Sequence, residues 1–146
     1  MCIRDRVEIR NGGNNGIVQT GASTTDPDPN YWYDLFIEEL TKFKASPAGS
    51  KFWGARIIWT VSRGKARAGV IADMQNALVK KAKYPDLISG YDLVSQEDLG
   101  RPLSDLAPEL IWFQRQTESL NLTMPYFFHA GETLGCLLYT SPSPRD

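Results

Sequence analysis

The hydrophobic positions of this 146-residue chain follow two alternating periods. Short runs rich in β-branched and aromatic residues, which are typical of strands, alternate with segments in which apolar residues recur every three or four positions, as on one face of a helix. The strand-like runs are 7–10, 55–61, 87–94 and 125–128, and the helix-like segments cover about 28–44, 70–83 and 108–120. This order, βαβαβαβ, implies a parallel sheet with right-handed helical crossovers.

Each predicted helix has one apolar face and recognisable ends. We expect Asp28 to be the N-cap of the first helix and Pro29 its first helical residue. Lys80, Lys81 and Lys83 fall in the last turn of the second helix, where they are expected to suit the helix dipole and to be solvated. The predicted buried stripes are Trp32, Leu35, Phe36, Leu40 and Phe43, then Val70, Ile71, Met74 and Leu78, then Leu110, Ile111, Phe113 and Leu120.

Two architectures fit this alternation, a TIM barrel and an open doubly wound sheet. Active sites in both lie at the C-terminal ends of the strands, where polar residues of this chain gather. The glycines at 12, 13 and 16 lack the spacing of a dinucleotide-binding loop and no helix follows them directly, which favours the barrel. The chain would supply about four of the eight βα units of such a barrel. The polar residues at the strand ends are Arg10, Arg63, the loop 96–98, His129 and Glu132.

Composition and charge exclude several classes of protein. With 42% apolar and 23% charged residues, the chain has the composition of one soluble globular domain. A net charge of -1 gives no electrostatic footprint for nucleic acid or for an anionic membrane. No apolar run approaches the roughly 18 to 20 residues of a membrane-spanning helix. We expect Trp53 and Trp59 to pack between helix and sheet rather than to form a stacking platform.

The two ends of the chain are expected to be translated sequencing adapter. Residues 136–140 can be encoded by a nucleotide stretch whose reverse complement translates as residues 1–5. An adapter ligated to both ends of a cDNA fragment produces that relation. We therefore expect 1–6 and 136–146 to be artefact and 7–135 to be an internal fragment. The only two cysteines, Cys2 and Cys136, would lie outside it, so they indicate neither a disulfide nor a compartment.

The strongest candidate chemistry is the pair His129 and Glu132. His129 is the sole histidine and ends the fourth predicted strand. A neutral imidazole is a good zinc ligand, and a nearby carboxylate that is not a ligand can move protons. Gly131 between them allows a sharp turn, so that both side chains converge on one pocket. A histidine that is only hydrogen-bonded in the fold remains the alternative.

Two longer motifs surround these residues. Residues 127–133 read Phe-Phe-His-Ala-Gly-Glu-Thr, and residues 90–98 read Gly-Tyr-Asp-Leu-Val-Ser-Gln-Glu-Asp. Together they resemble the adenosine deaminase family, and most closely its extracellular growth-factor-type branch. Residues 7–10 are similar to the second barrel strand of that family, and 52–58 to the approach to its third. The resemblance implies a TIM-barrel hydrolase with a Zn²⁺ cofactor that converts adenosine or deoxyadenosine to inosine and ammonia.

The resemblance also assigns roles by position. His129 would be one zinc ligand, and Glu132 the acid that protonates N1 of the purine during attack of hydroxide on C6. Asp92, Ser95 and Gly131 would bind the substrate. The family has Gly where this chain has Ser95, and a Ser Cβ would crowd the approach of the backbone to the purine. The other ligands and a catalytic His and Asp would lie outside the fragment, which is therefore expected to be inactive, since a catalytic zinc takes three protein ligands.

Several alternatives stay open at this stage. The parent protein could be another amidohydrolase-type deaminase, acting on a nucleotide or a free base, or a growth-factor-like homologue that binds adenosine without turning it over. The resemblance further implies secretion and a possible homodimer, with adenosine as the small-molecule partner. Residues 121–123, Asn-Leu-Thr, match the N-glycosylation sequon. Arg63 and Arg101 would either contact substrate or solvate loops.

Overall fold

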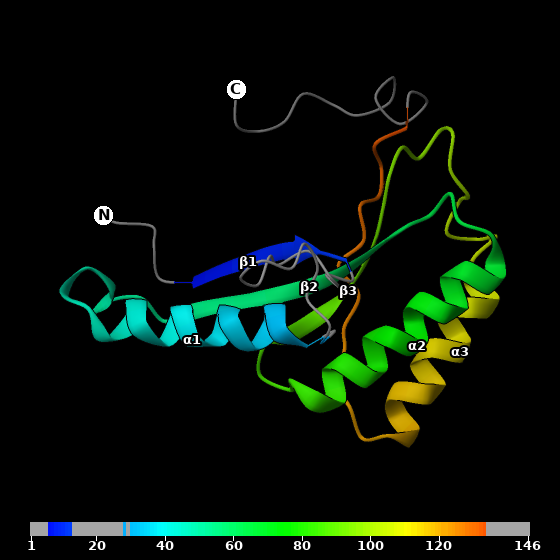
Figure 1. The fold of residues 1–146 in the computed structure, drawn as a ribbon. Helices are drawn as coiled ribbons and strands as arrows, with labels where there is room; N and C mark the ends of the chain where they lie inside the picture. The colour runs from blue at the N-terminus through cyan, green and yellow to red at the C-terminus, as the bar shows by residue number, and fades with distance from the viewer. Residues whose placement is uncertain (1–5, 13–27, 29, 134–146) are drawn as a thin grey trace.

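The computed structural model of the chain describes residues 6–12, 28 and 30–133, and over these residues it is an α/β unit (Figure 1). Its elements alternate as the sequence predicts. The predicted loop 11–30 lies mostly outside the described residues, as do both cysteines. The elements are β1 (Arg6–Asn11), α1 (Tyr31–Ala45), the 3-10 turn η1 (Pro47–Gly49), β2 (Gly54–Ser62), α2 (Arg67–Lys83), β3 (Ile88–Val94) and α3 (Ala107–Ser119).

The three described strands form one parallel sheet in the order β1-β2-β3. β1 and β2 stay in step from the pair Arg6 and Gly54 onward. β2 and β3 share one irregularity, between Ile57 and Ile58, and then stay in step to Ser62 and Val94. Such sequential parallel pairing is what helical crossovers between neighbouring strands produce. The fold is therefore compatible with part of a barrel.

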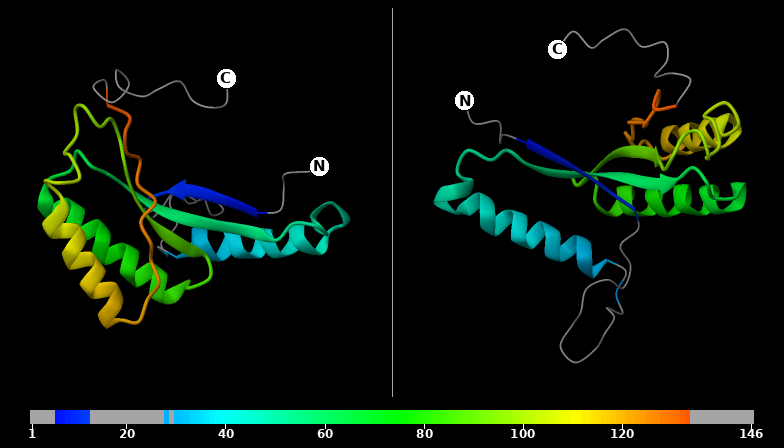
Figure 2. Two further views of the ribbon diagram at one scale, coloured as in Figure 1. Left: turned by 180° about the vertical axis from the view of Figure 1, so that it is seen from behind. Right: turned by 90° about the horizontal axis from the view of Figure 1, so that it is seen from above.

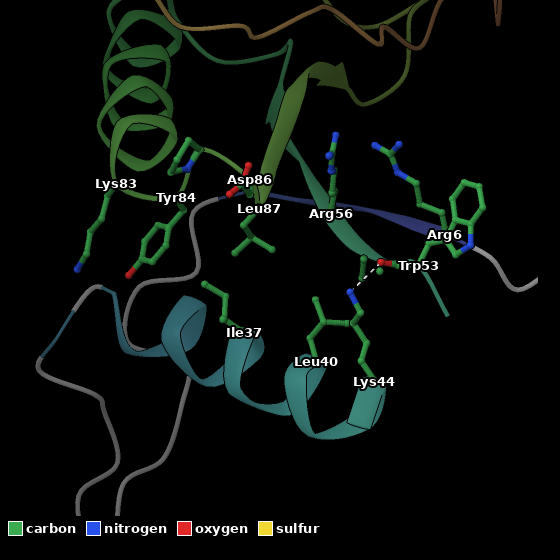
Figure 3. A pocket seen from close by; sticks show the side chains of 13 residues that line it. Arg6, Ile37, Leu40, Lys44, Trp53, Arg56, Lys83, Tyr84, Asp86 and Leu87 are labelled. Atoms are coloured by element: carbon green, nitrogen blue, oxygen red, sulfur yellow. Dashed lines mark hydrogen bonds between the residues drawn. The ribbon is translucent and has the colours of Figure 1, made fainter. Parts of the chain in front are cut away.

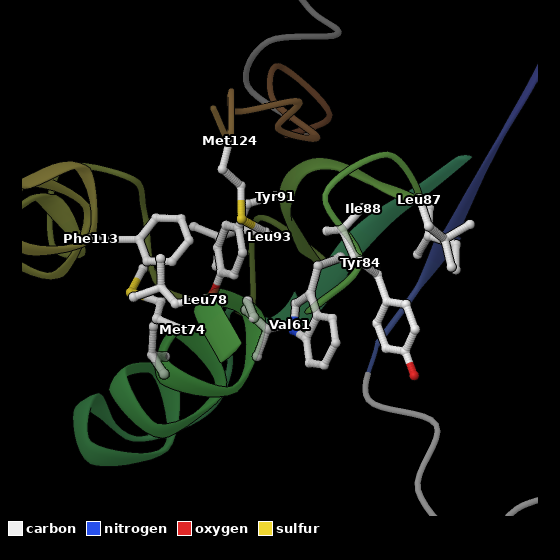
Figure 4. Packing of buried hydrophobic residues seen from close by; sticks show 14 of the residues in the cluster. Val61, Met74, Leu78, Tyr84, Leu87, Ile88, Tyr91, Leu93, Phe113 and Met124 are labelled. Atoms are coloured by element: carbon white, nitrogen blue, oxygen red, sulfur yellow. The ribbon is translucent and has the colours of Figure 1, made fainter. Parts of the chain in front are cut away.

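One face of the sheet packs on the helices and forms the core (Figures 2 and 4). Ile57, Trp59 and Val61 of β2 alternate toward this face, and Tyr91 and Leu93 of β3 continue it. Ile58 between them is also buried, which confirms that β2 is covered on both faces. The helices contribute Tyr33 from α1, Val70, Met74, Ala77 and Leu78 from α2, and Phe113 from α3.

The fourth predicted strand is not a regular strand. It makes a single parallel bridge to β3, through Tyr126 and Tyr91. The Tyr91 N–H donates to the Pro125 carbonyl at 2.9 Å, and the Phe127 N–H donates to the Tyr91 carbonyl at 2.9 Å. Pro125 has no N–H to extend this ladder, and the chain turns beyond His129. The segment nevertheless lies beside β3, where a fourth strand would lie.

The start of α1 differs from the prediction. The N-cap is Asn30, not Asp28, and the helix begins at Tyr31. Asp28 instead holds the turn before the helix, because its Oδ1 accepts a hydrogen bond from the Asn30 N–H at 2.8 Å and its carbonyl accepts one from the Tyr31 N–H at 3.1 Å. The backbone hydrogen bond from Asn30 lowers the pKa of Asp28. Pro29 lies outside the described residues.

The predicted apolar face of α1 is only half-buried. Phe43 is exposed, and the one fully buried residue of the helix is Tyr33, which the predicted stripe omits. Tyr33 stacks on Tyr84, with ring centroids 5.3 Å apart. Trp59 is buried as expected, whereas Trp53 is exposed, so its predicted packing is wrong.

Two lysines at the end of α2 are buried, whereas the sequence predicts that they are solvated. The Lys81 Nζ donates to the carbonyls of Pro85 and Ile88, at 2.6 and 2.7 Å. The Lys80 Nζ donates to Asn30 Oδ1 at 2.7 Å. Burial lowers the pKa of both lysines. Their ammonium groups therefore bind polar groups of the turn into β3 and of the start of α1 rather than water.

The buried face of α3 is rotated from the predicted one. Ile111 and Leu120, predicted to be buried, are 51% and 54% exposed. The buried residues are Glu109, Phe113 and Thr117, each one turn after the last. A charged residue can enter this face because Arg67 of α2 donates to Glu109 Oε1 at 2.9 Å. The apolar pattern alone does not reveal that partner.

α3 ends in a Schellman motif that uses the sequon asparagine. Asn121 has a φ of 52°, in the left-handed region that Asn tolerates better than most residues. Its N–H donates to the Glu118 carbonyl at 3.1 Å, and the Leu122 N–H donates to the Thr117 carbonyl at 2.9 Å. Asn121 therefore has a structural role that is independent of glycosylation. None of the helices in the described part of the chain is long and apolar enough to span a bilayer.

The two faces of α3 predict different costs of truncation. Phe113→Ala should lower the free energy of unfolding by about 3–5 kcal/mol, because it removes a fully buried ring from the core. Ile111→Ala on the exposed side of the same helix should change it by less than about 0.5 kcal/mol. Urea unfolding of the two variants measures both values. Equal losses would show that Ile111 is buried and the helix is oriented as the sequence predicts.

Candidate functional site

The predicted site residues gather at the C-terminal edge of the sheet. β2 ends just before Arg63, β3 ends just before the loop that carries Glu97, and the segment beside β3 ends at His129. Because these segments run parallel, their C-terminal ends meet at one edge. The structure therefore confirms the gathering that the strand order predicts.

Asp92 of β3 is the most deeply buried charge at this edge. Its Oδ2 accepts a hydrogen bond from Arg10 Nε of β1 at 2.7 Å, and its Oδ1 accepts one from the backbone N–H of His129 at 2.9 Å. Oδ2 also lies 2.7 Å from His129 Nδ1, although this nitrogen makes no hydrogen bond. Both oxygens of Asp92 thus contact protein groups.

His129 is held with one ring nitrogen against this carboxylate. Its side chain is 32% exposed, and Nε2 is the nitrogen on the opposite side of the ring from Asp92. A carboxylate behind the imidazole is the usual arrangement of a metal-ligating histidine, since it fixes the ring. Within the described residues, however, no group of three or more His, Cys, Asp or Glu side chains could hold a metal. This part of the chain offers one fitting ligand, not a complete site.

A second ion pair, Arg63 with Glu97, holds the chain on either side of residue 130. The Arg63 guanidinium donates to the carbonyls of His129 and Leu93, at 2.5 and 3.2 Å, and lies 3.4 Å from Glu97 Oε1. Glu97 Oε2 accepts hydrogen bonds from the N–H groups of Gly131 and Glu132, both at 3.0 Å. The turn that carries the candidate acid is therefore bound through its own backbone.

The two arginines that the sequence left unassigned have separate roles. Arg63 is only 2% exposed and bonds to backbone carbonyls, so loop solvation is not its role. Arg101 donates from Nε to Asp105 Oδ2 at 2.5 Å. This contact lowers the pKa of Asp105.

Gly131 and Glu132 complete the turn. Gly131 has a φ of 82°, a left-handed conformation that glycine adopts without strain, and this confirms the sharp turn expected there. Glu132 follows it and is exposed to solvent at the edge of the sheet. The structure therefore brings His129, Glu132, Gly131 and Asp92 together.

Ser95 adopts a conformation that suits glycine. It directly follows β3 and has a φ of 85°, which a residue with a Cβ reaches only with strain. Its hydroxyl shares a hydrogen bond of 2.8 Å with the Ser62 hydroxyl, at the end of β2. The departure from the family glycine thus places a Cβ and a hydroxyl pair at the edge of the candidate site.

Two cavities lie at the other end of the strands. One, of about 570 Å³, lies between α1 and the beginnings of β2 and β3, beside Leu40, Trp53 and Leu87 (Figure 3). The other, of about 340 Å³, is lined by Arg6, Ser89 and neighbouring residues. Neither of these two cavities is lined by His129, Glu132 or Asp92.

Curated relatives connect this geometry with a family, although no family model matches the chain. Adenosine deaminase from Lutzomyia longipalpis is 42% identical over 99 residues, which is 68% of this chain and 18% of that protein. Adenosine deaminase 2-A from Danio rerio is 40% identical over 86 residues, 56% of this chain and 16% of that protein. The chain is similar to part of the adenosine deaminases.

The adenosine deaminase resemblance expected from the motifs is thereby confirmed. Adenosine deaminase 2 from Dictyostelium discoideum extends the similarity to 117 residues, 80% of this chain, at 30% identity. Proteins named adenosine deaminase 2 are thus among the relatives, in line with the growth-factor-type branch. The chain spans only about a fifth of the length of this relative, 21%, and less of the other two.

The sequence predicts His129 and Glu132 as candidate reacting residues, but it does not predict the residues that hold them. In the sequence, Glu97 stands out only as part of the polar loop 96–98, and Arg63 has two possible roles. The available signal was their placement, since each follows the end of one of two adjacent parallel strands. Opposite charges at adjacent strand ends are within reach of each other, and this placement could have suggested the pair.

The burial of Asp92 predicts a stability cost for its neutralisation. Asp92→Asn should lower the free energy of unfolding by about 1–3 kcal/mol, because Arg10 and His129 lose a buried acceptor. Asp73→Asn, which removes the exposed-side ion pair with Lys65, should cost less than about 1 kcal/mol. Urea unfolding of the two variants gives the comparison. A cost for Asp92→Asn no larger than the control would contradict the holding role.

Proposed function

We propose that this chain is a segment of a zinc-dependent adenosine deaminase-type hydrolase of TIM-barrel fold, which converts adenosine or deoxyadenosine to inosine and ammonia. The similarity to proteins named adenosine deaminases supports the reaction. The observation that carries the proposal is the turn from His129 to Glu132, held at the C-terminal edge of a parallel sheet. This edge is where barrel enzymes place their reacting groups.

His129 would supply one of the zinc ligands through Nε2. Asp92 holds the opposite ring nitrogen and the backbone N–H, so the imidazole is fixed before a metal arrives. Bound zinc would acidify water, so that a nucleophile exists at neutral pH. The remaining ligands would come from parts of the protein beyond this segment. For that reason we propose that the segment alone is inactive.

Glu132 would move the proton that the reaction requires. Deamination replaces the amino group on C6 by oxygen, and protonation of N1 makes C6 more electrophilic for this attack. A carboxylic acid near N1 supplies that proton. Because Gly131 and Glu132 are held through their N–H groups, the side chain of Glu132 starts from a fixed backbone. A fixed backbone limits the positions that the Glu132 carboxyl group can take, which favours the geometry needed for proton transfer.

Ser95 supports a second candidate function, that of a homologue which binds adenosine without turnover. Its φ of 85° and its hydrogen bond to Ser62 place a side chain where the family has none. A Cβ at this edge changes how closely the backbone can approach a purine. On the growth-factor-type resemblance we extend both candidates to a secreted protein that forms a homodimer. A deaminase acting on a nucleotide or free base has no separate support among the described residues.

The deaminase proposal predicts a specific loss in one variant. In the complete protein, Glu132→Gln should lower kcat for conversion of adenosine to inosine by about 10²–10⁴-fold, because it removes a general acid. The matched control is Glu38→Gln, on the exposed face of α1, which should keep wild-type turnover. Loss of absorbance on conversion to inosine measures the rate. A zinc chelator should abolish the turnover of wild-type protein.

The alternatives have distinct outcomes in the same assay. Absence of turnover by folded, zinc-loaded protein, together with calorimetric binding of adenosine, would establish the binding-only homologue. Ser95→Gly would then be the variant in which turnover should be restored. Turnover by residues 7–135 alone would contradict the proposed inactivity of the segment.

A further inference from the structure

We infer that the Arg63–Glu97 pair is a positioning unit for Glu132, one that fixes the distance between the candidate proton donor and His129. The inference rests on the proposed function. It concerns how the acid is held, not which residue is the acid. Neither Arg63 nor Glu97 would touch the substrate.

The hydrogen bonds of the turn carry the inference. Glu97 Oε2 alone binds two consecutive N–H groups, those of Gly131 and Glu132. Two bonds to one oxygen fix both the place and the orientation of the peptide between them. Gly131 has the widest conformational freedom of any residue type, so the turn requires such an external restraint. The carboxylate of Glu97 provides it.

Arg63 extends the restraint to the other side of the turn. Its guanidinium contacts the His129 carbonyl at 2.5 Å and Glu97 Oε1 at 3.4 Å. One ion pair therefore holds the carbonyl of the candidate ligand residue and the N–H groups of the candidate acid residue. Displacement of either charge would change the spacing between His129 and Glu132, since each is bound to a different member of the pair.

The pair is enclosed by the fold. The side chains of Arg63 and Glu97 are 2% and 7% exposed. Gly100 lies against the stem of Arg63, and a Cβ there would come within 2.6 Å of Arg63 Cγ and 2.7 Å of the Gln96 carbonyl oxygen. The loop after β3 thus closes around the guanidinium stem. Around the two buried side chains, water therefore competes weakly for the charges of the ion pair.

Burial also distinguishes positioning from substrate contact. Arg63 donates to two backbone carbonyls, and both oxygens of Glu97 face protein donors. Catalysis is sensitive to such restraints, because a misplacement of about 1 Å can cost about 10²-fold in rate. A residue that acts through backbone placement should change kcat and leave KM nearly unchanged.

The test uses the complete zinc-loaded protein and adenosine as substrate. Glu97→Gln and Arg63→Lys should each lower kcat by about 10²-fold with KM within about threefold of wild type. The matched control is Glu109→Gln, which removes a carboxylate as buried as that of Glu97 but paired with the half-exposed Arg67 instead of with the turn. That control should lower the melting temperature but not kcat. Guanidinium ion added to Arg63→Ala should restore part of its lost rate.

Amide hydrogen exchange provides a readout that does not depend on turnover. In Glu97→Gln the amides of residues 131 and 132 should exchange at least about tenfold faster, while those of α2 stay unchanged. If wild-type protein does not turn over adenosine, the proposed function fails and the exchange result alone decides the positioning role. If Arg63→Ala does not fold, Gly100→Ala is the variant to use instead, because its added Cβ displaces the stem of Arg63.

One set of results would overturn the inference. Unchanged exchange at residues 131 and 132, or a kcat of Glu97→Gln that falls only as much as that of Glu109→Gln, would mean that the Arg63–Glu97 pair is structural only. Faster exchange together with a selective loss of kcat would establish it. Where wild-type protein is inactive, faster exchange alone would support it and unchanged exchange would refute it.

Discussion

The carboxylate of Asp92 is the constraint on which the arrangement of this sheet edge depends. A charge without solvent must find partners, since an unpaired buried carboxylate is too costly to retain. Asp92 finds them 82 positions back along the chain, in Arg10, and 37 positions forward, in His129. The first strand and the last described segment are thereby bound to β3. The orientation of the imidazole follows from the same contacts.

Two buried acids, Asp92 and Glu97, hold different parts of this edge. Asp92 belongs to a strand and accepts from the Arg10 side chain and the His129 N–H, whereas Glu97 belongs to a loop, accepts from two consecutive N–H groups and pairs with Arg63. The opposite face of β3 carries Tyr91 and Leu93 into the core. Strand alternation therefore places the apolar core residues of β3 on one face and the site carboxylate on the other.

Much of this architecture could be predicted from the sequence, because strand and helix periods are local properties. Strands 7–10, 55–61 and 87–94 all lie within the observed strands or within one residue of them. What failed depends on partners distant in sequence. Ile111 is exposed because Glu109 with its partner Arg67 takes the inner face of α3. Lys81 is buried because it binds carbonyls of the turn that follows it. The family resemblance points to His129 and Glu132, but the contacts of Arg63 can be seen only in the three-dimensional structure.

The position of Asn121 determines where an N-linked glycan would be attached to this protein. Asn121 lies just after α3, which runs back toward the beginnings of the strands (Figure 1), whereas His129 follows the segment beside β3 at the C-terminal edge. A sugar chain attached there would leave the mouth of the site uncovered. It would also grow from a residue whose backbone terminates a helix. Replacing this asparagine would remove the attachment point of the carbohydrate and would also strain the left-handed backbone that ends the helix.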